Sequence, residues 1–96
     1  MKYDIEYLPS ADHDLEYMGN VLAEYPRMLA RIFREMEDKL QLLREHPRMY
    51  PIYAHRRKYR KMVLEEYLLF YTIDDNRQMI TVCRVLYGKM NMNRQL

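Results

Sequence analysis

The residues most able to do chemistry form a run of cations in the middle of the chain. Arg56, Arg57, Lys58, Arg60 and Lys61 place five positive charges within six positions. Clustered cations neutralise phosphates and gain affinity by releasing counterions, and they suit an acidic peptide equally well. Lys and Arg on an edge strand can also simply prevent one sheet from pairing with another. The run therefore predicts a partner-binding surface and leaves the partner's chemistry open.

Aromatic and imidazole side chains lie among these cations. Tyr50, Tyr53 and Tyr59 interleave with the run and could stack on bases, although ten tyrosines in 96 residues make some proximity expected by chance. His55 directly precedes the run. An imidazole beside cations titrates low and could act as a base near a phosphate, or it could be a solvated loop residue.

A second polar cluster ends the chain, with Arg84 in the apolar stretch MITVCRVLY. An arginine there must reach the open face of a sheet or find a partner, because burying it unpaired would be very costly. The residues after it read either as a polar tail or as the continuation of a site. They are Tyr87, Lys89, Asn91, Asn93 and Arg94.

Composition and motifs narrow the function classes. The chain has no HExxH, GxSxG, CxxC pair, P-loop or GxGxxG motif, and its three histidines lack metal-like spacing, so we expect no metal and no cofactor. One cysteine, Cys83, excludes an internal disulfide, fits a reducing compartment and should be buried in its apolar strand. The first residues, MKYDIEYLP, lack the apolar run of a signal peptide or membrane span. We expect a cytoplasmic protein with no membrane partner.

The charge is divided unevenly along the chain. Residues 1–46 carry six Lys/Arg and ten Asp/Glu, whereas residues 47–96 carry ten Lys/Arg and four Asp/Glu. Such asymmetry suggests a polyanionic or acidic partner facing the second half, although solvated residues at the rim of a sheet would produce the same division.

Three consecutive strands must position these clusters. Tyr67–Ile73 is a nearly unbroken apolar and aromatic run, Met79–Tyr87 repeats that composition after the polar break at residues 74–77, and Tyr59–Leu64 is a shorter strand. Connections this short allow only an antiparallel meander, because a parallel crossover needs a dozen or more residues.

The first half supplies a strand and two helices. Lys2–Leu8 alternates apolar and polar residues, as in a strand with one buried face. Pro9 ends it, and Ser10 is placed to cap a helix with the apolar stripe Leu15, Met18, Leu22 and Tyr25. A second helix follows from Pro26 to His46, with the stripe Leu29, Ile32, Phe33, Met36, Leu40 and Leu43.

The order β-α-α-β-β-β predicts an α+β fold of two layers. A helix hairpin should pack on one face of a four-stranded, mainly antiparallel sheet, within one domain over residues 1–96. The opposite, cation-rich face should then be free to bind. Residues 48–58 should form a loop, and the tail after Gly88 should form a last helical turn or lie across the fold.

At this point the chain resembles the RelE/ParE superfamily of toxins from type II toxin–antitoxin modules. The resemblance spans nearly the whole length, in the order Pro9-Ser10-Ala11-x-x-Asp14-Leu15, His46-Pro47, Tyr59-Arg60-Lys61, Tyr67-Leu68-Leu69-Phe70-Tyr71 and Arg84-Val85-Leu86-Tyr87-Gly88. It implies the β-α-α-β-β-β fold of that superfamily and places the chain in a toxin–antitoxin pair.

The resemblance implies two possible targets. One branch cleaves mRNA on the ribosome and has an arginine after the aromatic that starts the third strand; here Leu68 follows Tyr67, and Met90 stands where a further basic residue is expected. The other branch poisons DNA gyrase without hydrolysing anything, and FYTI…CRVLYGKMNMNRQL looks closer to it, although Tyr87 replaces its usual histidine.

We therefore expect a ParE-like toxin that inhibits gyrase and is neutralised by a small acidic antitoxin. Residues expected to contact the target or antitoxin are Arg56, Arg57, Lys58, Arg60, Lys61, Arg84, Tyr87, Lys89, Asn91 and Arg94. The alternative is a ribosome-dependent mRNA endoribonuclease that uses some of His55, Arg60, Lys61, Arg84 and Tyr87. A third possibility is an inactive homologue that only binds its partner.

Overall fold

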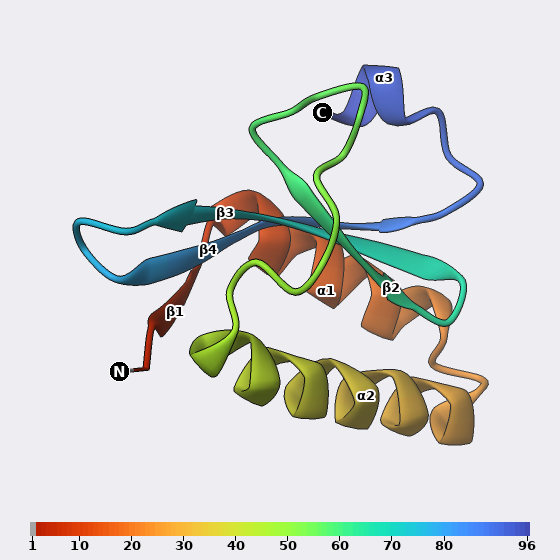
Figure 1. Ribbon diagram of the computed structural model, residues 1–96. Helices are drawn as coiled ribbons and strands as arrows, with labels where there is room; N and C mark the ends of the chain where they lie inside the picture. Colours follow the sequence, from red (N-terminus) through yellow and green to blue (C-terminus); the bar gives the residue numbers. More distant parts are fainter. Residues whose placement is uncertain (1) are drawn as a thin grey trace.

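The computed structural model describes residues 2–96, and its elements follow the predicted order with one short helix added in the tail (Figure 1). The strands and helices are β1 (Asp4–Tyr7), α1 (Pro9–Val21), α2 (Pro26–Glu45), β2 (Arg60–Leu64), β3 (Tyr67–Asp74), β4 (Met79–Tyr87) and α3 (Met92–Gln95). The predicted β-α-α-β-β-β fold is confirmed, and the tail forms the last helical turn that its sequence allowed.

The four strands form one sheet in the order β1-β4-β3-β2. β2, β3 and β4 form the predicted antiparallel meander, whereas β1 lies parallel to β4, with Asp4 opposite Met79 and Tyr7 opposite Val82. The first strand of the chain therefore pairs with the last, and the sheet is mainly antiparallel as predicted.

Short turns hold the meander in register. The backbone N–H of Arg77 donates to Asp74 Oδ1 at 3.2 Å in the turn between β3 and β4. After β4, the N–H of Gly88 donates to the Glu66 carbonyl at 2.7 Å, and a Cβ at position 88 would lie 3.0 Å from that oxygen. Any other residue there would crowd the Glu66 carbonyl, so the close backbone approach favours glycine.

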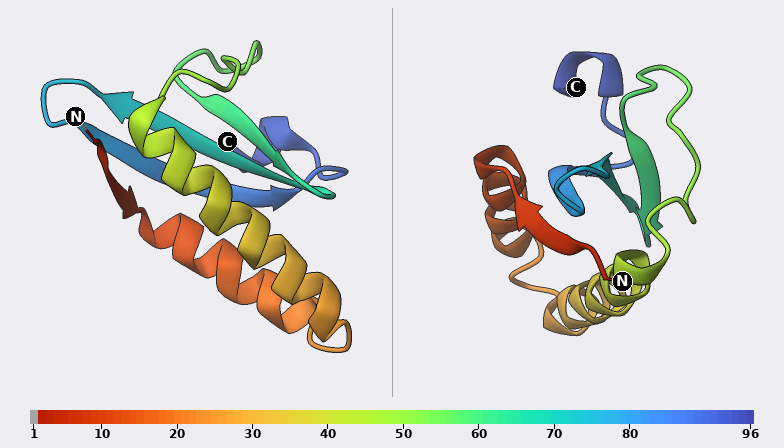
Figure 2. Two further views of the ribbon diagram at one scale, coloured as in Figure 1. Left: turned by 60° about the horizontal axis from the view of Figure 1, so that its bottom comes forward. Right: turned by 60° about the vertical axis from the view of Figure 1, so that its left-hand side comes forward.

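The main core lies between the sheet and the two helices, which run side by side on one face of the sheet (Figure 2). Both predicted stripes contribute to it: Met18 from α1 and Ile32 and Leu43 from α2 are at most 1% exposed. The buried Tyr71 donates its hydroxyl hydrogen to the Pro47 carbonyl at 2.9 Å, and burial raises the pKa of Tyr71 to about 12.

Two details of the first helix differ from the sequence-based expectation. Ser10 is not the N-cap, because the helix begins at Pro9 and Leu8 takes the capping position. The Ser10 hydroxyl instead donates to the Cys83 carbonyl of β4 at 2.7 Å. Tyr25 does not join the apolar stripe, because α1 ends at Val21 and the turn that follows leaves Tyr25 59% exposed.

The face of the sheet opposite the helices is partly covered rather than free. Phe70, Cys83 and Leu86 are buried but lie outside the helix-side core. Tyr53 and Tyr59 pack edge-on against Phe70, with ring centroids 5.1 and 6.2 Å away. Figure 1 shows the loop after α2 and helix α3 on this side, away from α2. The expected burial of Cys83 is confirmed, and burial raises the pKa of its thiol.

Within residues 2–96, no helix is both long and apolar enough to cross a membrane.

Candidate partner-binding surface

The predicted basic run begins in a compact loop between α2 and β2 and ends with Arg60 and Lys61 in β2. The Tyr53 N–H donates to the Tyr59 carbonyl at 2.8 Å, and the Arg56 N–H donates to the Tyr53 carbonyl at 3.1 Å. These bonds close the loop on itself, and Arg56, Arg57 and Lys58 are exposed at its tip. Backbone hydrogen bonds within the loop thus position three solvent-exposed cations at its tip.

A pocket of about 160 Å³ brings several cations together. Arg57, Lys58 and Arg60 line it with Arg48, a residue that the sequence reasoning did not select. Its remaining lining residues are Ile52, Thr72 and Ile73, so none of its walls is acidic. Positive charge without an acid among the lining residues favours binding of a phosphate or carboxylate.

Two of the cations that line this pocket, Arg48 and Arg60, already have hydrogen-bond partners within the protein and are therefore less available to bind a partner. Arg60 donates through Nη1 to the Tyr50 carbonyl at 2.7 Å and also approaches the Arg48 carbonyl at 3.4 Å. Arg48 donates from both of its terminal nitrogens to Asp75, the shorter contact being 2.6 Å. Arg57 and Lys58 are therefore the two cations of this pocket that have neither a salt bridge nor a carbonyl partner among the described residues.

Asp75 joins three separate segments. It accepts from Arg48 and also from the hydroxyl of Tyr3 at 2.6 Å. The hydrogen bonds from Arg48 and then Tyr3 lower the pKa of Asp75 to about 2. This exposed cluster connects the start of the chain, the loop after α2 and the turn between β3 and β4.

The tyrosines of the loop are already engaged within the protein. The Lys58 ammonium lies 5.0 Å from the centre of the Tyr59 ring, and the Lys61 ammonium lies 5.8 Å from that of Tyr53. Both rings also pack on Phe70. His55, the candidate base, is exposed and packs edge-on against Tyr53 with centroids 5.4 Å apart.

Arg84 is not a free cation. Its Nε and Nη2 donate to the two carboxylate oxygens of Asp14 at 2.7 and 3.0 Å, and Nη1 donates to the Gln95 carbonyl at 2.5 Å. The two side chains are only 23% and 13% exposed. Hydrogen bonding to Asp14 raises the pKa of Arg84 more than burial lowers it. The partner that the sequence required for Arg84 is therefore Asp14 on α1.

Asp14 and Ser10 also complete the edge of β4. β1 pairs with β4 only as far as Val82, and the remaining edge is covered by α1. The Ser10 hydroxyl reaches the Cys83 carbonyl, and the Val85 N–H donates to Asp14 Oδ2 at 2.9 Å. Sequence reasoning missed this role, although the spacing of four residues placed both side chains on one helix face.

A separate pocket of about 110 Å³ lies between the tail and the body of the fold, and of the predicted site residues only Arg84 and Tyr87 line it. Its lining residues are Asp14, Tyr17, Tyr67, Arg84, Val85, Leu86, Tyr87, Met90 and Gln95. Tyr87 packs edge-on against Tyr67 at 5.7 Å, and the Asn91 side chain accepts from the Asn93 N–H to cap α3. Lys89 and Arg94 are exposed.

The tail and the basic loop lie on the same side of the sheet (Figure 1). Their two pockets have no residue in common. The predicted site residues therefore form two neighbouring groups rather than one concavity. Fixed positive charge in the loop can neutralise an anion, whereas the charge of Arg84 is used within the fold. No three His, Cys, Asp or Glu side chains among residues 2–96 gather in a way that could hold a metal ion.

The family described as ParE toxin of the type II toxin–antitoxin system parDE matches residues 5–92 of the chain. The chain belongs to the ParE toxin family. This ParE-family protein is thus the toxin of a type II toxin–antitoxin module, within the RelE/ParE superfamily that its sequence resembles. No curated protein sequence matches it.

Solved structures confirm the fold of this ParE-family toxin. A chain of the ParDE system of P. aeruginosa is 11% identical with a TM-score of 0.73, covering 92% of this chain and 98% of that one. A chain of the RelBE2 toxin–antitoxin complex of Mycobacterium tuberculosis is 22% identical with a TM-score of 0.67, covering 91% and 99%. A chain of the intact E. coli RelBE complex is 18% identical with a TM-score of 0.65, covering 92% and 99%.

Proposed function

We propose that residues 1–96 act in the cytoplasm as a single toxin domain that inhibits DNA gyrase without hydrolytic chemistry. The observation that carries the proposal is that Arg84 is already hydrogen-bonded within the protein, to Asp14 and to the Gln95 carbonyl. A nuclease would need this cation to stabilise a phosphorane. Electrostatic stabilisation of that kind requires charge directed at the reacting phosphate. A cation that is paired with an acid within the protein stabilises the folded state and is not directed at a substrate phosphate.

The residue after Tyr67 adds support. Leu68 pairs with Leu86 across β3 and β4 and is only half-buried. The nuclease branch of the superfamily is expected to carry an arginine at this position, so an aliphatic side chain stands where a second phosphate-binding cation would be. With Arg84 engaged and leucine at position 68, hydrolysis lacks two of its expected electrostatic contributions.

The basic loop supplies the proposed contact with the target. Arg56, Arg57 and Lys58 present exposed charge on a closed loop, and the half-buried Lys61 follows in β2. A gyrase cleavage complex offers DNA phosphates as well as protein carboxylates, and both are ligands for such cations. Tyr87, Lys89, Asn91 and Arg94 would extend this contact from the tail.

A gyrase assay tests the proposal directly. Purified toxin at micromolar concentration is added to gyrase and relaxed plasmid, and supercoiling and cleaved DNA are measured. We expect inhibition of supercoiling with accumulation of cleaved complexes. The double variant Arg57→Ala/Lys58→Ala should lose the effect by about tenfold or more, because charged contacts at an interface dominate association with a charged target.

The matched control removes two cations from the opposite side of the molecule. Arg27→Ala/Arg34→Ala makes the same change in net charge on exposed positions of α2, and it should inhibit gyrase as the wild type does. Unaffected supercoiling with wild-type toxin would contradict gyrase as the target. Primer extension on translated messages would then test mRNA cleavage by His55, Arg60, Lys61, Arg84 and Tyr87, with codon-registered cuts lost in Arg84→Ala.

We further propose that a small acidic antitoxin neutralises the toxin. The solved complexes that share its fold are toxin–antitoxin complexes. The second half of the chain carries ten cations against four acids, and a disordered acidic segment that folds on binding suits such a surface.

A further inference from the structure

Tyrosine side chains from three elements gather at one end of the molecule. Tyr17 lies on α1, Tyr67 begins β3 and Tyr87 ends β4. The rings of Tyr67 and Tyr87 pack edge to face, with centroids 5.7 Å apart and planes inclined at 65°. Burial, and then the nearby Tyr87 and Tyr17, raise the pKa of Tyr67. Tyr67 is buried, whereas Tyr87 and Tyr17 are 38% and 67% exposed, so solvent reaches this group of rings.

All three rings line one cavity of about 660 Å³, named here the tyrosine pocket. Val21 and Met28 from the helix hairpin, Ile32 from α2 and Met90 from the tail complete its apolar walls. Figure 1 shows the α1–α2 connection, the β2–β3 turn and the end of β4 together at the right-hand end of the molecule. Small-molecule sites are typically cavities of about 300–1,000 Å³ with mostly apolar walls and a few polar groups. The tyrosine pocket has that size and that composition.

The charged residues of the tyrosine pocket leave one carboxylate without a salt bridge. Arg31 Nε donates to Glu65 Oε1 at 2.6 Å, so these two charges neutralise each other. Glu66, the next residue of the β2–β3 turn, is exposed and takes part in no salt bridge within residues 2–96. Arg84 adjoins the same tyrosines in the smaller pocket, but it is paired with Asp14. An incoming molecule therefore meets one uncompensated negative charge.

Aromatic rings beside a carboxylate select an organic cation. A cation over an aromatic face, within about 6 Å of the ring centre, is attracted by the negative potential of that face. Groups of such rings recognise quaternary ammonium compounds for this reason. The carboxylate of Glu66 adds charge attraction and repels anions. The apolar walls further favour a ligand whose ammonium group is attached to an apolar body.

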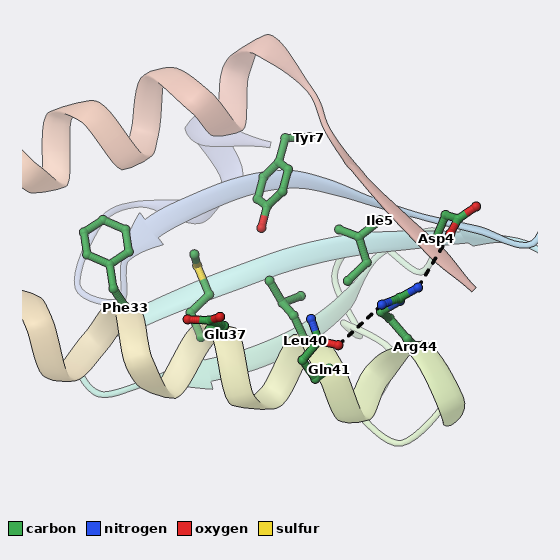
Figure 3. Close-up of a pocket in the computed structure, with 9 residues that line it drawn as sticks. Asp4, Ile5, Tyr7, Phe33, Glu37, Leu40, Gln41 and Arg44 are labelled. Atoms are coloured by element: carbon green, nitrogen blue, oxygen red, sulfur yellow. Dashed lines mark hydrogen bonds and ion pairs between the residues drawn. The ribbon is translucent and has the colours of Figure 1, made fainter. Parts of the chain in front are cut away.

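The groove between β1 and α2 is of similar size, about 620 Å³, but has a different arrangement. Figure 3 shows Tyr7 and Phe33 on opposite walls of it, and their rings make no aromatic contact with each other or with any other described ring. Glu37 in this groove also has no salt bridge within residues 2–96. Both cavities thus offer a carboxylate, but contacting rings line only the tyrosine pocket, which makes the groove an internal control.

We propose that the tyrosine pocket binds a small amphipathic organic cation, an amine or quaternary ammonium compound with an apolar body. Its ammonium group lies against the tyrosine rings near Glu66, and its apolar body packs on Val21, Met28 and Ile32. The bound molecule contacts the helix hairpin, the β2–β3 turn and the tail together. The site requires neither the proposed gyrase target nor the antitoxin.

The first test compares two probes that share a phenyl ring and differ in charge. Benzyltrimethylammonium and benzyl alcohol are titrated separately into the whole chain, and NMR chemical shifts give the location and the Kd of each. We expect shifts at Tyr17, Tyr87 and Met90, with the cation bound about fivefold or more tighter than the alcohol, because only the cation gains cation–π and charge attraction.

The second test removes the free carboxylate. Glu66→Gln should weaken binding of benzyltrimethylammonium by about threefold or more and leave that of benzyl alcohol within about twofold, because only the cation is attracted by the charge. Glu16→Gln is the matched control. It makes the same change at an exposed position on α1 that lies outside the tyrosine pocket and has no salt bridge among the described residues, and it should bind as the wild type does.

The third test separates the ring from its hydroxyl group. Tyr87→Leu should weaken binding of benzyltrimethylammonium by about fivefold or more, whereas Tyr87→Phe keeps the ring and should stay within about twofold of wild type. Tyr7→Leu removes a ring from the groove of Figure 3 and should also stay within about twofold.

The outcomes decide the inference without reference to the proposed function. Preference for the cation, with selective losses in Glu66→Gln and Tyr87→Leu, supports it. Equal affinity for the two probes overturns it, as does absence of binding or equal binding by Glu66→Gln and Glu16→Gln. Loss in Tyr7→Leu but not in Tyr87→Leu places the cation in the groove and also overturns it. Each of these results leaves gyrase inhibition and the antitoxin partner untouched, because neither enters the measurements.

Discussion

Arg84, Arg57 and Lys58 are all positively charged, but their surroundings in the fold differ. Arg84 lies in an apolar strand and is held by Asp14 and Gln95, with its side chain 23% exposed. Arg57 and Lys58 lie at the tip of an exposed loop. Arg48 is intermediate, because it is paired with Asp75 although both side chains are 54% exposed. The comparison teaches that a cation's environment, rather than its proximity to other cations, separates a stabilising residue from a binding one.

The largest effect is expected from Asp14→Ala. The substitution leaves the Arg84 guanidinium without its carboxylate and the Val85 N–H without an acceptor. Removing one partner of a largely buried ion pair should lower the free energy of unfolding by about 3–4 kcal/mol. Urea unfolding followed by circular dichroism measures it. A loss as small as that of a surface substitution would show that α1 does not secure the β4 edge through this residue.

Arg84→Ala should have a smaller but clear effect. Asp14 then loses its cation but still accepts from the Val85 N–H, so we expect a loss of about 2–3 kcal/mol in the free energy of unfolding. Arg94→Ala removes an exposed cation from the same tail and should stay within about 0.5 kcal/mol of wild type. Equal stability of the two variants would contradict the distinction between engaged and free cations.

The exposed Arg48–Asp75 pair should show a weak acid dependence. Its hydrogen bonds lower the pKa of Asp75 to about 2 from 3.8. The stabilisation is therefore fully present above about pH 4 and is lost as the pH falls through about 2. Wild type should lose slightly more stability over that range than Asp75→Asn, whose side chain does not titrate. Urea midpoints at about pH 5 and about pH 2 measure the difference, and identical acid dependence would remove any role for this pair.

The smallest effect on stability, with the largest on function, is expected for Arg57→Ala/Lys58→Ala. Neither residue has a salt bridge among residues 2–96, so the free energy of unfolding should change by less than about 0.5 kcal/mol. Growth arrest on induction should nevertheless be lost. Retained growth arrest would place the target contact elsewhere, and a destabilised variant would show that the loop cations support the fold.

The sequence was sufficient for the elements of the fold, because their periodicities are local. Met79–Tyr87 was predicted with the bounds that the structure has, and Tyr67–Ile73 ends one residue short of the observed strand. The parallel pairing of β1 with β4 was not specified, since alternation along Lys2–Leu8 indicates a strand but not its neighbour. The packing of Tyr53 and Tyr59 on Phe70 was not predicted either. The sequence of a loop does not show which face of the sheet the loop crosses.

The candidate site was predicted less completely than the fold. The basic loop was identified because its charges are consecutive, and the need of Arg84 for a partner followed from its apolar neighbours. The role of Asp14 was not predicted, since its contact with residues 84 and 85 depends on how α1 packs. Arg48 joined the cationic pocket only through the course of the loop, although it stands eight positions before Arg56. The groove beside β1 depends on the distance between two elements, and no residue pattern reports that distance.

The junction of the chain's two ends has a consequence for biosynthesis. Leu8, Ser10 and Asp14 reach their bonding partners only at residues 82–85 of the final strand. Contacts so distant along the chain form late, since the intervening polypeptide must first be ordered. A nascent molecule on the ribosome therefore has no completed sheet until β4 has been synthesised.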